Sequence, residues 1–359
     1  MSGVTPPTGV VTPGRLARLR NWVSCHRAPI VMVALAIIIP EVLTGSTPVL
    51  NLIDPFAVAG LLGFYGAGVL LIRDLAIRWG KGWAAILPLG LAYGIAEEGI
   101  ATKTMVYPRS TAAGHLATYG HYLGISWNFA VVIDIFHAVY SIALPILIIG
   151  LLYPETRGQR WLSDRGLTGT FLILAATVTF GFFGFVPGYF EGWAVLGFLL
   201  IILGAFVGLA RYCPPEWAKP CAEVPQRSPA WFLGLGIAFA AGWFFFYLPA
   251  PFLLSIPLLS ILGEIGTAAG AFCLARKHLG RSGNSLHCVY FAAGILSWYI
   301  PWDVVIGLFL GDYLVVFFLV AIYILLYRLK VRYSRVVPTT TPGSEPTPPF
   351  PGVDPGKLR

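Results

Sequence analysis

Long apolar runs constrain this chain more than any other feature of its sequence. Ten stretches between residues 29 and 327 approach or exceed the roughly 18–20 residues that a helix needs to cross a bilayer. Only 11% of the 359 residues are charged, against roughly 25% in soluble domains. The runs are continuous rather than alternating, which excludes a β-barrel. The predicted fold class is therefore all-α, a polytopic transmembrane helical bundle.

The distribution of positive charge predicts the orientation of this bundle. With a cytoplasmic N-terminus, all but two of the 24 Lys and Arg residues lie on the inner side, and only Lys103 and Arg109 lie outside. Positive residues concentrate on the cytoplasmic side of membrane proteins, so both termini are predicted to be cytoplasmic in a multi-pass protein of the plasma membrane. The expected spans are 29–45, 54–76, 83–106, 126–152, 167–187, 192–210, 229–248, 252–275, 286–301 and 304–327.

The segments that flank the spans differ from them in composition. Residues 1–28 are predicted to form a basic, disordered N-terminal segment, 29–330 the ten-span domain, and 331–359 a Pro/Thr-rich disordered tail. The net charge of +8 lies at helix ends rather than in one basic patch, which excludes nucleic acid as a partner. The expected partner is the lipid bilayer.

The stretch YGIAEEGIATKT places two adjacent carboxylates, Glu97 and Glu98, inside the third predicted span. The fourth span carries Asp134 and His137. Each charge inside a membrane costs at least roughly 2.5–3.5 kcal/mol, so such residues are usually functional or paired. Both pairs are expected about 8–11 residues from the outer end of their span, roughly 12–16 Å below the surface. The sequence therefore predicts one polar cluster in the outer half of the bilayer.

Helical spacing assigns roles within this cluster. Asp134, His137 and Ser141 are spaced i, i+3 and i+7 and share one stripe of a helix. Asp134 is expected to hold the imidazole, because a carboxylate–His pair fixes the tautomer and basicity of the ring. Adjacent residues of an α-helix point about 100° apart. Only one of Glu97 and Glu98 is therefore expected to face the cluster, with Glu98 preferred.

Further charged residues are weighed between two interpretations. Glu41, Glu264, Asp312 and Asp303 are candidates for the same polar cavity, or else for polar bonds to a neighbouring helix. The Arg73–Asp74 pair near the inner interface and Lys103 near the outer interface are instead expected to extend their charged ends to water.

The Glu-Glu pair on one span and the histidine on the next resemble the CAAX protease and bacteriocin-processing family of intramembrane proteases. That family carries EExxxR, then FxxxH, then HxxxN on a later helix, and its glutamate and histidines activate water for peptide hydrolysis. Glu97 and Glu98 match the first motif, and IDIFH ending at His137 matches the second. Thr102 stands where the arginine belongs, and Ile133 replaces the phenylalanine. The resemblance covers about residues 83–150.

The third motif of that family has no counterpart here, because His278 is followed at +4 by Ser282 and His287 by Phe291. The chain also looks like an uncharacterised group of prokaryotic ten-span membrane proteins. That second resemblance rests on the stretches PEVLTGSTP, LLIRDLAIRWG, AYGIAEEG and FHAVYSIALPILI, and it implies no activity.

Three functions remain open from the sequence. The first is an intramembrane peptidase acting on a peptide or membrane-protein substrate, with Glu97, Glu98, Asp134 and His137 as catalytic candidates. In that reading Glu98 and His137 are candidates for holding a divalent metal such as zinc, and Ser141 is disfavoured as a nucleophile. The second is a proton- or cation-coupled secondary transporter that uses the same cluster. The third is a membrane assembly protein without catalytic activity.

Overall fold

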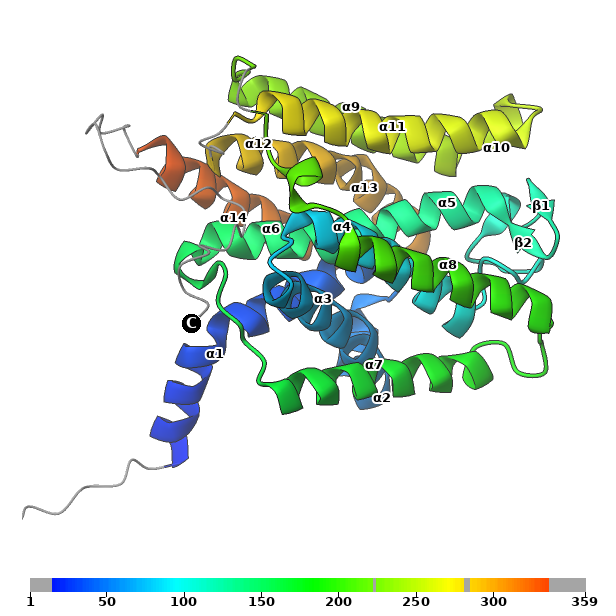
Figure 1. Cartoon of the computed structure of the whole chain (residues 1–359), viewed down its shortest axis with the longest axis horizontal. Helices are drawn as coiled ribbons and strands as arrows, with labels where there is room; N and C mark the ends of the chain where they lie inside the picture. Colours follow the sequence, from blue (N-terminus) through cyan, green and yellow to red (C-terminus); the bar gives the residue numbers. More distant parts are fainter. Residues whose placement is uncertain (1–14, 222–223, 281–284, 336–359) are drawn as a thin grey trace, which may run out of the picture.

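A computed structural model describes residues 15–221, 224–280 and 285–335. Of the segments 1–28 and 331–359 that are predicted to be disordered, residues 1–14 and 336–359 lie outside the described residues. Within them the fold is almost entirely helical, with one two-stranded hairpin (Figure 1). α1 begins at Arg15, so helix covers about half of the segment 1–28.

Short 3₁₀ and π helices, labelled η, interrupt or extend the α-helices. The first half of the chain contains α1 (Arg15–Ile37), η1 (Ile38–Val42), η2 (Val49–Ile53), α2 (Pro55–Leu61), η3 (Leu62–Gly66), α3 (Ala67–Arg78), α4 (Trp83–Gly94), η4 (Ile95–Ala101), η5 (Gly114–Ala117), β1 (His121–Tyr122), β2 (Ile125–Ser126), α5 (Trp127–Phe136), η6 (His137–Ala143) and α6 (Leu144–Leu152). The second half contains η7 (Pro154–Thr156), α7 (Asp164–Gly184), α8 (Trp193–Tyr212), η8 (Pro215–Ala218), α9 (Pro229–Tyr247), α10 (Ala250–Leu253), α11 (Pro257–His278), α12 (Ser285–Ile295), η9 (Leu296–Trp298), α13 (Tyr299–Leu310) and α14 (Val315–Ser334).

Eight helices in the described part of the chain are long and apolar enough to cross a membrane. They are Pro55–Arg78, Trp83–Ala101, Trp127–Leu152, Asp164–Gly184, Trp193–Tyr212, Pro229–Tyr247, Pro257–His278 and Ser285–Phe309. These correspond to the second to ninth predicted spans, which confirms a membrane-embedded helical bundle. α1 and α14 are not among the eight, so ten spans and cytoplasmic termini stay predictions, as does the plasma membrane.

The last two predicted spans have different boundaries in the structure. A single apolar helical stretch runs from Ser285 to Phe309 through α12, η9 and α13. The predicted break at residues 302–303 is therefore wrong, and α14 begins only at Val315. Pro301 does not end the helix because it lies in the first turn of α13, where its missing N–H costs no hydrogen bond.

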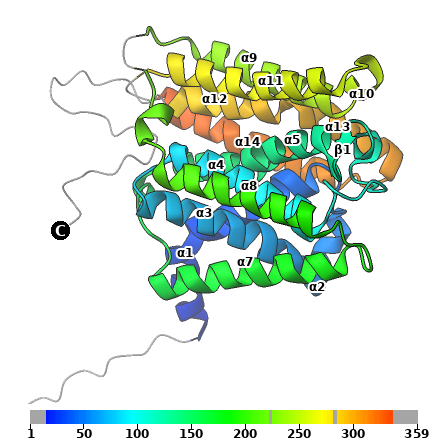
Figure 2. The same ribbon diagram turned by 45° about the vertical axis from the view of Figure 1, so that its right-hand side comes forward.

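The helices run roughly side by side in both views (Figures 1 and 2). α9 and α11 lie along one edge, α2 and α7 along the opposite edge, and α4, α5 and α6 between them. Burial agrees with this order, because 78% of the apolar window of Trp127–Leu152 is buried but only 6% of that of Asp164–Gly184. Two apolar cores flank the central helices, one formed mainly with α9 and α12–α14, the other with α1, α3 and α4.

Two predicted snorkelling sites are wrong, because both hold charges inside the protein. Arg73 and Asp74 are 5% and 1% exposed. Arg73 donates to the carbonyls of Thr156 and Gln159 at 2.8 and 3.1 Å, and Asp74 accepts from the Trp161 amide at 2.9 Å. The pair therefore fastens the loop after α6 to α3.

Lys103 is the second of these sites and is 2% exposed. It donates to the Tyr189 carbonyl at 2.7 Å and lies 4.0 Å from the ring centre of Phe182. A backbone carbonyl and an aromatic face at and just beyond the C-terminal end of α7 thus interact with the ammonium group in place of water.

Glycine lets α4 approach η6 and α5 closely. A Cβ atom on Gly90 would lie 2.7 Å from the Cα atom of Ala138, and one on Gly94 would lie 3.1 Å from that of Asp134. Glycines four residues apart form one small-residue face along a helix, which permits close helix packing in membranes. This face brings the C-terminal end of α4 against the middle of the Trp127–Leu152 helix.

We expect Gly90→Val to destabilise the protein by about 1–3 kcal/mol, because the added atoms overpack a backbone contact. Detergent-induced unfolding of the purified protein measures this change. Gly204→Val is the matched control, because a Cβ atom there meets nothing within 4 Å. Equal losses in both variants would show that the effect comes from helix propensity and not from the α4–η6 contact.

Candidate functional site

The polar residues of the third and fourth predicted spans gather where four helices change to π-helical geometry. Each of η1, η3, η4 and η6 is a π-helix of five to seven residues. Glu41 lies in η1, Tyr65 in η3, Glu97 and Glu98 in η4, and His137 with Ser141 in η6. π-helical turns are rare and occur frequently at functional sites. Four of them, each with a polar residue, mark this region as the candidate site.

The local sequence accounts for two of these turns. Pro145 has no N–H to donate to the carbonyl of Ser141, so the α-helical pattern is broken at η6, and Pro40 has the same effect within η1. η4 contains no proline, but the amide of Thr102 donates to the Glu97 carbonyl at 2.8 Å, a bond that spans five residues. We name the polar cluster by its members: Glu41, Tyr65, Tyr93, Glu97, Glu98, Thr102, Thr104, His137 and Ser141.

Both carboxylates of the Glu-Glu pair face the same imidazole. His137 Nε2 lies 3.0 Å from Glu98 Oε1, and Nδ1 lies 3.4 Å from Glu97 Oε2. The prediction that one of them turns away is wrong, because the wider π turn reduces the angle between adjacent side chains and each oxygen reaches a different ring nitrogen. The side chains of Glu97 and His137 are 5% and 2% exposed, so this charge group is removed from water.

Ser141, rather than Asp134, holds the ring. His137 Nδ1 and Ser141 Oγ are 3.0 Å apart, whereas within the described residues no hydrogen bond joins Asp134 to the imidazole, and Asp134 Oδ1 is buried without a hydrogen-bond partner. The predicted Asp134–His137 pair is therefore wrong as a hydrogen bond. Asp134 instead lies against Gly94 of α4, while the π turn carries Ser141 under the ring.

The chain beyond η4 turns back and binds Glu98. Its Oε2 accepts hydrogen bonds from Thr102 Oγ1 at 3.0 Å and from Thr104 Oγ1. With His137 on Oε1, both oxygens of Glu98 are engaged. This return requires a sharp turn, and Lys103 supplies it with a φ of +60°.

Glu97 and Glu98 lie closer to the end of their helix than predicted. η4 ends at Ala101, three residues after Glu98, whereas His137 is ten residues from the start of α5. The glutamates and His137 still lie at the same level, because residues 102–126 fold over the end of η4 and pack beside the first part of α5. Leu116, Ile125 and Val106 of this segment are buried.

Tyrosines extend the cluster to α1. The Tyr65 hydroxyl donates to Glu41 Oε1 at 2.5 Å, and its ring stacks 6.3 Å from that of His137. Thr47 donates to the other oxygen of Glu41 at 2.5 Å. The Tyr93 ring lies edge-on to His137 at 5.7 Å. The sequence prediction missed Tyr65, although its flanking Gly63 and Gly66 were a signal of weakened α-helix.

Two polar atoms of the cluster are buried and make no hydrogen bond of full geometric quality, although they interact with each other. They are Glu97 Oε2, an acceptor, and the Tyr93 hydroxyl, a donor. Buried polar atoms are satisfied in most proteins, so each exception calls for an explanation. An acceptor and a donor that interact only weakly beside one imidazole suit a bridging polar ligand such as water or a carbonyl group.

The residues present do not fit the predicted zinc site. Among the described residues, no group of three or more His, Cys, Asp and Glu side chains is arranged to hold a metal ion. Both nitrogens of His137 already lie at hydrogen-bonding distance from Ser141 or Glu98, and structural or catalytic zinc needs at least three protein ligands.

The other predicted supporting residues lie elsewhere. Glu264 on α11 is 1% exposed and neither of its oxygens is hydrogen-bonded. Asp303 on α13 is likewise buried without a partner. Asp312 is not in a span, because it lies in the turn between α13 and α14 and accepts from the Val49 amide at 2.9 Å. Only Glu41 of this group joins the polar cluster.

Comparison with known proteins places the site within a family. A family model described as an uncharacterized membrane protein family matches residues 30–342, a stretch that includes the whole polar cluster. No curated protein and no solved structure matches the chain. No model of the CAAX protease and bacteriocin-processing family matches the chain, and the resemblance to the uncharacterised membrane group is confirmed in this coarser form.

We expect Glu98→Ala to lower the free energy of unfolding by about 3–5 kcal/mol, because it leaves a buried imidazole without its carboxylate. A double-mutant cycle with His137→Ala, measured by detergent-induced unfolding, should give a coupling energy of about 0.5–3 kcal/mol. The pair Glu98→Ala and Glu264→Ala, which are not in contact, should be additive. Additivity in both cycles would contradict the contact.

Proposed function

Because the chain belongs to this uncharacterized membrane protein family, we propose its function from the polar cluster itself: an intramembrane hydrolase that cleaves peptide bonds. The observation that carries the proposal is the buried acceptor Glu97 Oε2, which lies 3.4 Å from an imidazole that Glu98 and Ser141 hold in place. Acid–base hydrolysis needs a positioned base with an open lone pair.

Glu97 is the proposed general base. Glu98 is less suited to this role, because His137, Thr102 and Thr104 occupy both of its oxygens. A water molecule bound to Glu97 Oε2 would give its proton to that oxygen while its own oxygen attacks the peptide carbonyl carbon. The proton then passes from Glu97 to the amine nitrogen as the carbon–nitrogen bond breaks.

His137 and Tyr93 have supporting roles in this mechanism. The imidazole, anchored on Glu98 through Nε2, faces Glu97 through Nδ1 at 3.4 Å and offsets the charge of the base. The Tyr93 hydroxyl is a buried donor that interacts only weakly with Glu97, and it is the proposed donor to the oxygen of the tetrahedral intermediate. Oxyanion donors of this kind contribute roughly 10²–10³ in rate.

We expect Glu97→Gln to lower peptide hydrolysis by about 10²–10⁴-fold, because it removes the base with little change in shape. Turnover of a fluorogenic library of membrane-anchored peptides by the protein in liposomes measures this. Glu264→Gln is the control, since that carboxylate is equally buried but outside the cluster, and it should leave turnover unchanged. Turnover that survives Glu97→Gln, or the same loss in Glu264→Gln, would overturn the assignment.

A second function has a specific observation in its favour. Four helices change to π geometry where they carry the cluster, and interrupted helices with carboxylates are typical of secondary-transporter ion sites. Glu41, Tyr65 and His137 form a continuous side-chain path across three of them. The alternative is therefore a proton- or cation-coupled transporter that uses the same residues.

Proton flux separates this alternative from the hydrolase. If the cluster carries protons, we expect liposomes with an imposed pH gradient to show dye-detected flux that Tyr65→Phe reduces at least about tenfold, because the path from Glu41 is cut. Phe64→Leu, a buried substitution in the same turn, is the control. Proton flux without peptide hydrolysis supports the transporter. If neither flux nor hydrolysis is detected, the third function, a membrane assembly protein without catalytic activity, is favoured.

A further inference from the structure

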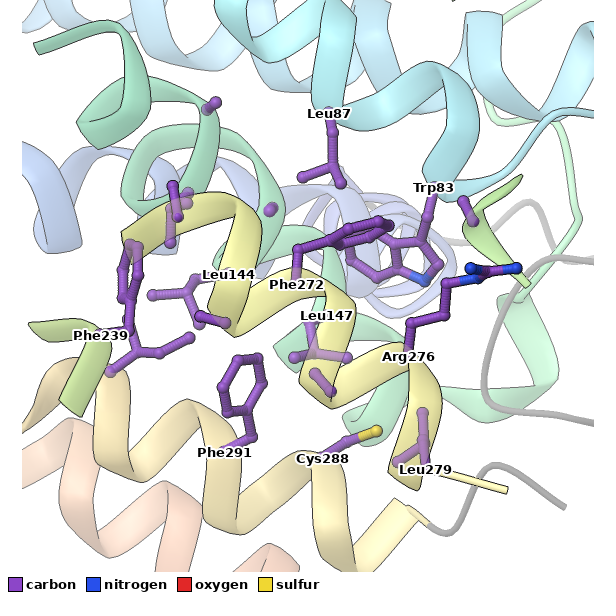
Figure 3. Close-up of a pocket in the computed structure, with 18 of the residues that line it drawn as sticks. Trp83, Leu87, Leu144, Leu147, Phe239, Phe272, Arg276, Leu279, Cys288 and Phe291 are labelled. Atoms are coloured by element: carbon purple, nitrogen blue, oxygen red, sulfur yellow. The ribbon is translucent and has the colours of Figure 1, made fainter. Parts of the chain in front are cut away.

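A second site lies on the opposite side of η6 from the imidazole. It is an apolar cavity of about 280 Å³ between α4, α11 and the central helices (Figure 3). Its walls are almost entirely hydrocarbon, and Ala138 and Val139 of η6 form part of them. No residue of the polar cluster lines it. We propose that this cavity binds one hydrocarbon chain of an anionic phospholipid of the surrounding bilayer.

The cavity begins at a membrane face. Trp83 is the first residue of α4, and Arg276 lies in the last turn of α11. Figure 3 shows these two residues at one end and Phe239 at the other. Trp and Arg at helix ends are typical of the membrane–water interface. This end is therefore where a lipid headgroup would lie.

The depth of the cavity fits one leaflet. Along α4 the lining extends from Trp83 to Leu91, and along α11 from Arg276 back to Ala268. Eight residues of helix correspond to about 12 Å. The hydrocarbon core of a bilayer is roughly 30 Å thick, so one leaflet occupies about half of that. A lipid chain from the leaflet on this side matches both the depth and the apolar walls.

Charge at the mouth favours an anionic headgroup. Arg276 donates to the carbonyls of Lys219 and Glu216 at 2.7 and 3.4 Å. In the described part of the chain no carboxylate forms an ion pair with it, because Glu216 pairs with Lys219. The guanidinium thus keeps an uncompensated positive charge at the rim, and guanidinium groups bind phosphate oxygens well.

Small residues create the space for the chain. Ala268, Ala271 and Ala275 lie on one face of α11 and all line the cavity. Ala269, next to them, is exposed on the outer side of the same helix. A tryptophan at position 271 would fill the cavity, while one at 269 would face the surrounding lipid.

The test uses the purified full-length protein in bilayer nanodiscs that contain a phospholipid with a photoactivatable diazirine in its chain. We expect phosphatidylglycerol, which is anionic, to label residues that line the cavity. Ala271→Trp should lower this labelling at least tenfold, whereas Ala269→Trp should not change it. If Ala271→Trp fails to fold, Ala268→Phe replaces it and should also lower the labelling. The peptide map of the unmodified protein then shows whether the labelled residues line the cavity.

The headgroup is tested separately. Arg276→Gln should abolish the preference for phosphatidylglycerol over zwitterionic phosphatidylcholine, and the neighbouring exposed Lys277→Gln should keep it. Labelling confined to residues outside the cavity, or equal labelling by both phospholipids in the unmodified protein, would overturn the proposal. So would cavity labelling by a diazirine fatty acid but by neither phospholipid.

Discussion

The imidazole of His137 between two carboxylates is the interaction on which the arrangement of the central helices depends. A lone charge in the membrane interior is expensive, and a buried pair is stable only when geometry and further hydrogen bonds compensate for lost water. Here the compensation comes from Ser141 on the ring and from Thr102 and Thr104 on Glu98. Glu98 lies on η4, His137 and Ser141 lie on η6, and Thr102 and Thr104 lie in the loop that returns after η4, so the charge group ties two helices and a loop together.

Close helix contact is the second requirement of this charge group. The glycine face of α4 allows η6 to approach until Gly90 touches the backbone of Ala138. Larger side chains there would hold the carboxylates away from the ring. The π turns then aim the side chains: they disrupt regular backbone bonding but direct Glu97, Glu98 and Ser141 at one imidazole. Such local departures from ideal geometry are common where function and stability compete.

Sequence reasoning reached the helical fold and the neighbourhood of Glu98 and His137, because hydropathy and depth along consecutive spans are one-dimensional properties. It failed where the backbone departs from an ideal helix. An α-helical 100° step separates Glu97 from Glu98, but the π turn of η4 changes that relation. A straight i, i+3 stripe assigns Asp134 to the ring, but the π turn of η6 brings Ser141 to Nδ1 instead. Asp312 was misplaced because apolar residues on both sides of Gly311 hid the turn between α13 and α14.

Arg73 and Lys103 show the same limit for charge. Near a span end, a long cationic side chain is expected to reach for water. In the structure, backbone carbonyls of the loops after α6 and α7 accept hydrogen bonds from Arg73 and Lys103, so these side chains do not extend to water. Whether a loop folds back over a helix end depends on its tertiary contacts, which no periodicity in the span itself reports.

The two proposed sites share one structural element, η6. His137 and Ser141 direct their polar atoms toward Glu97 and Glu98, while Ala138 and Val139 face the apolar cavity. One π-helical segment thus separates a charged group from a hydrocarbon-lined space. Close packing transmits small displacements across such a wall, because protein interiors have little free volume. If a lipid chain fills the cavity as proposed, it would contact the same η6 backbone that positions the imidazole.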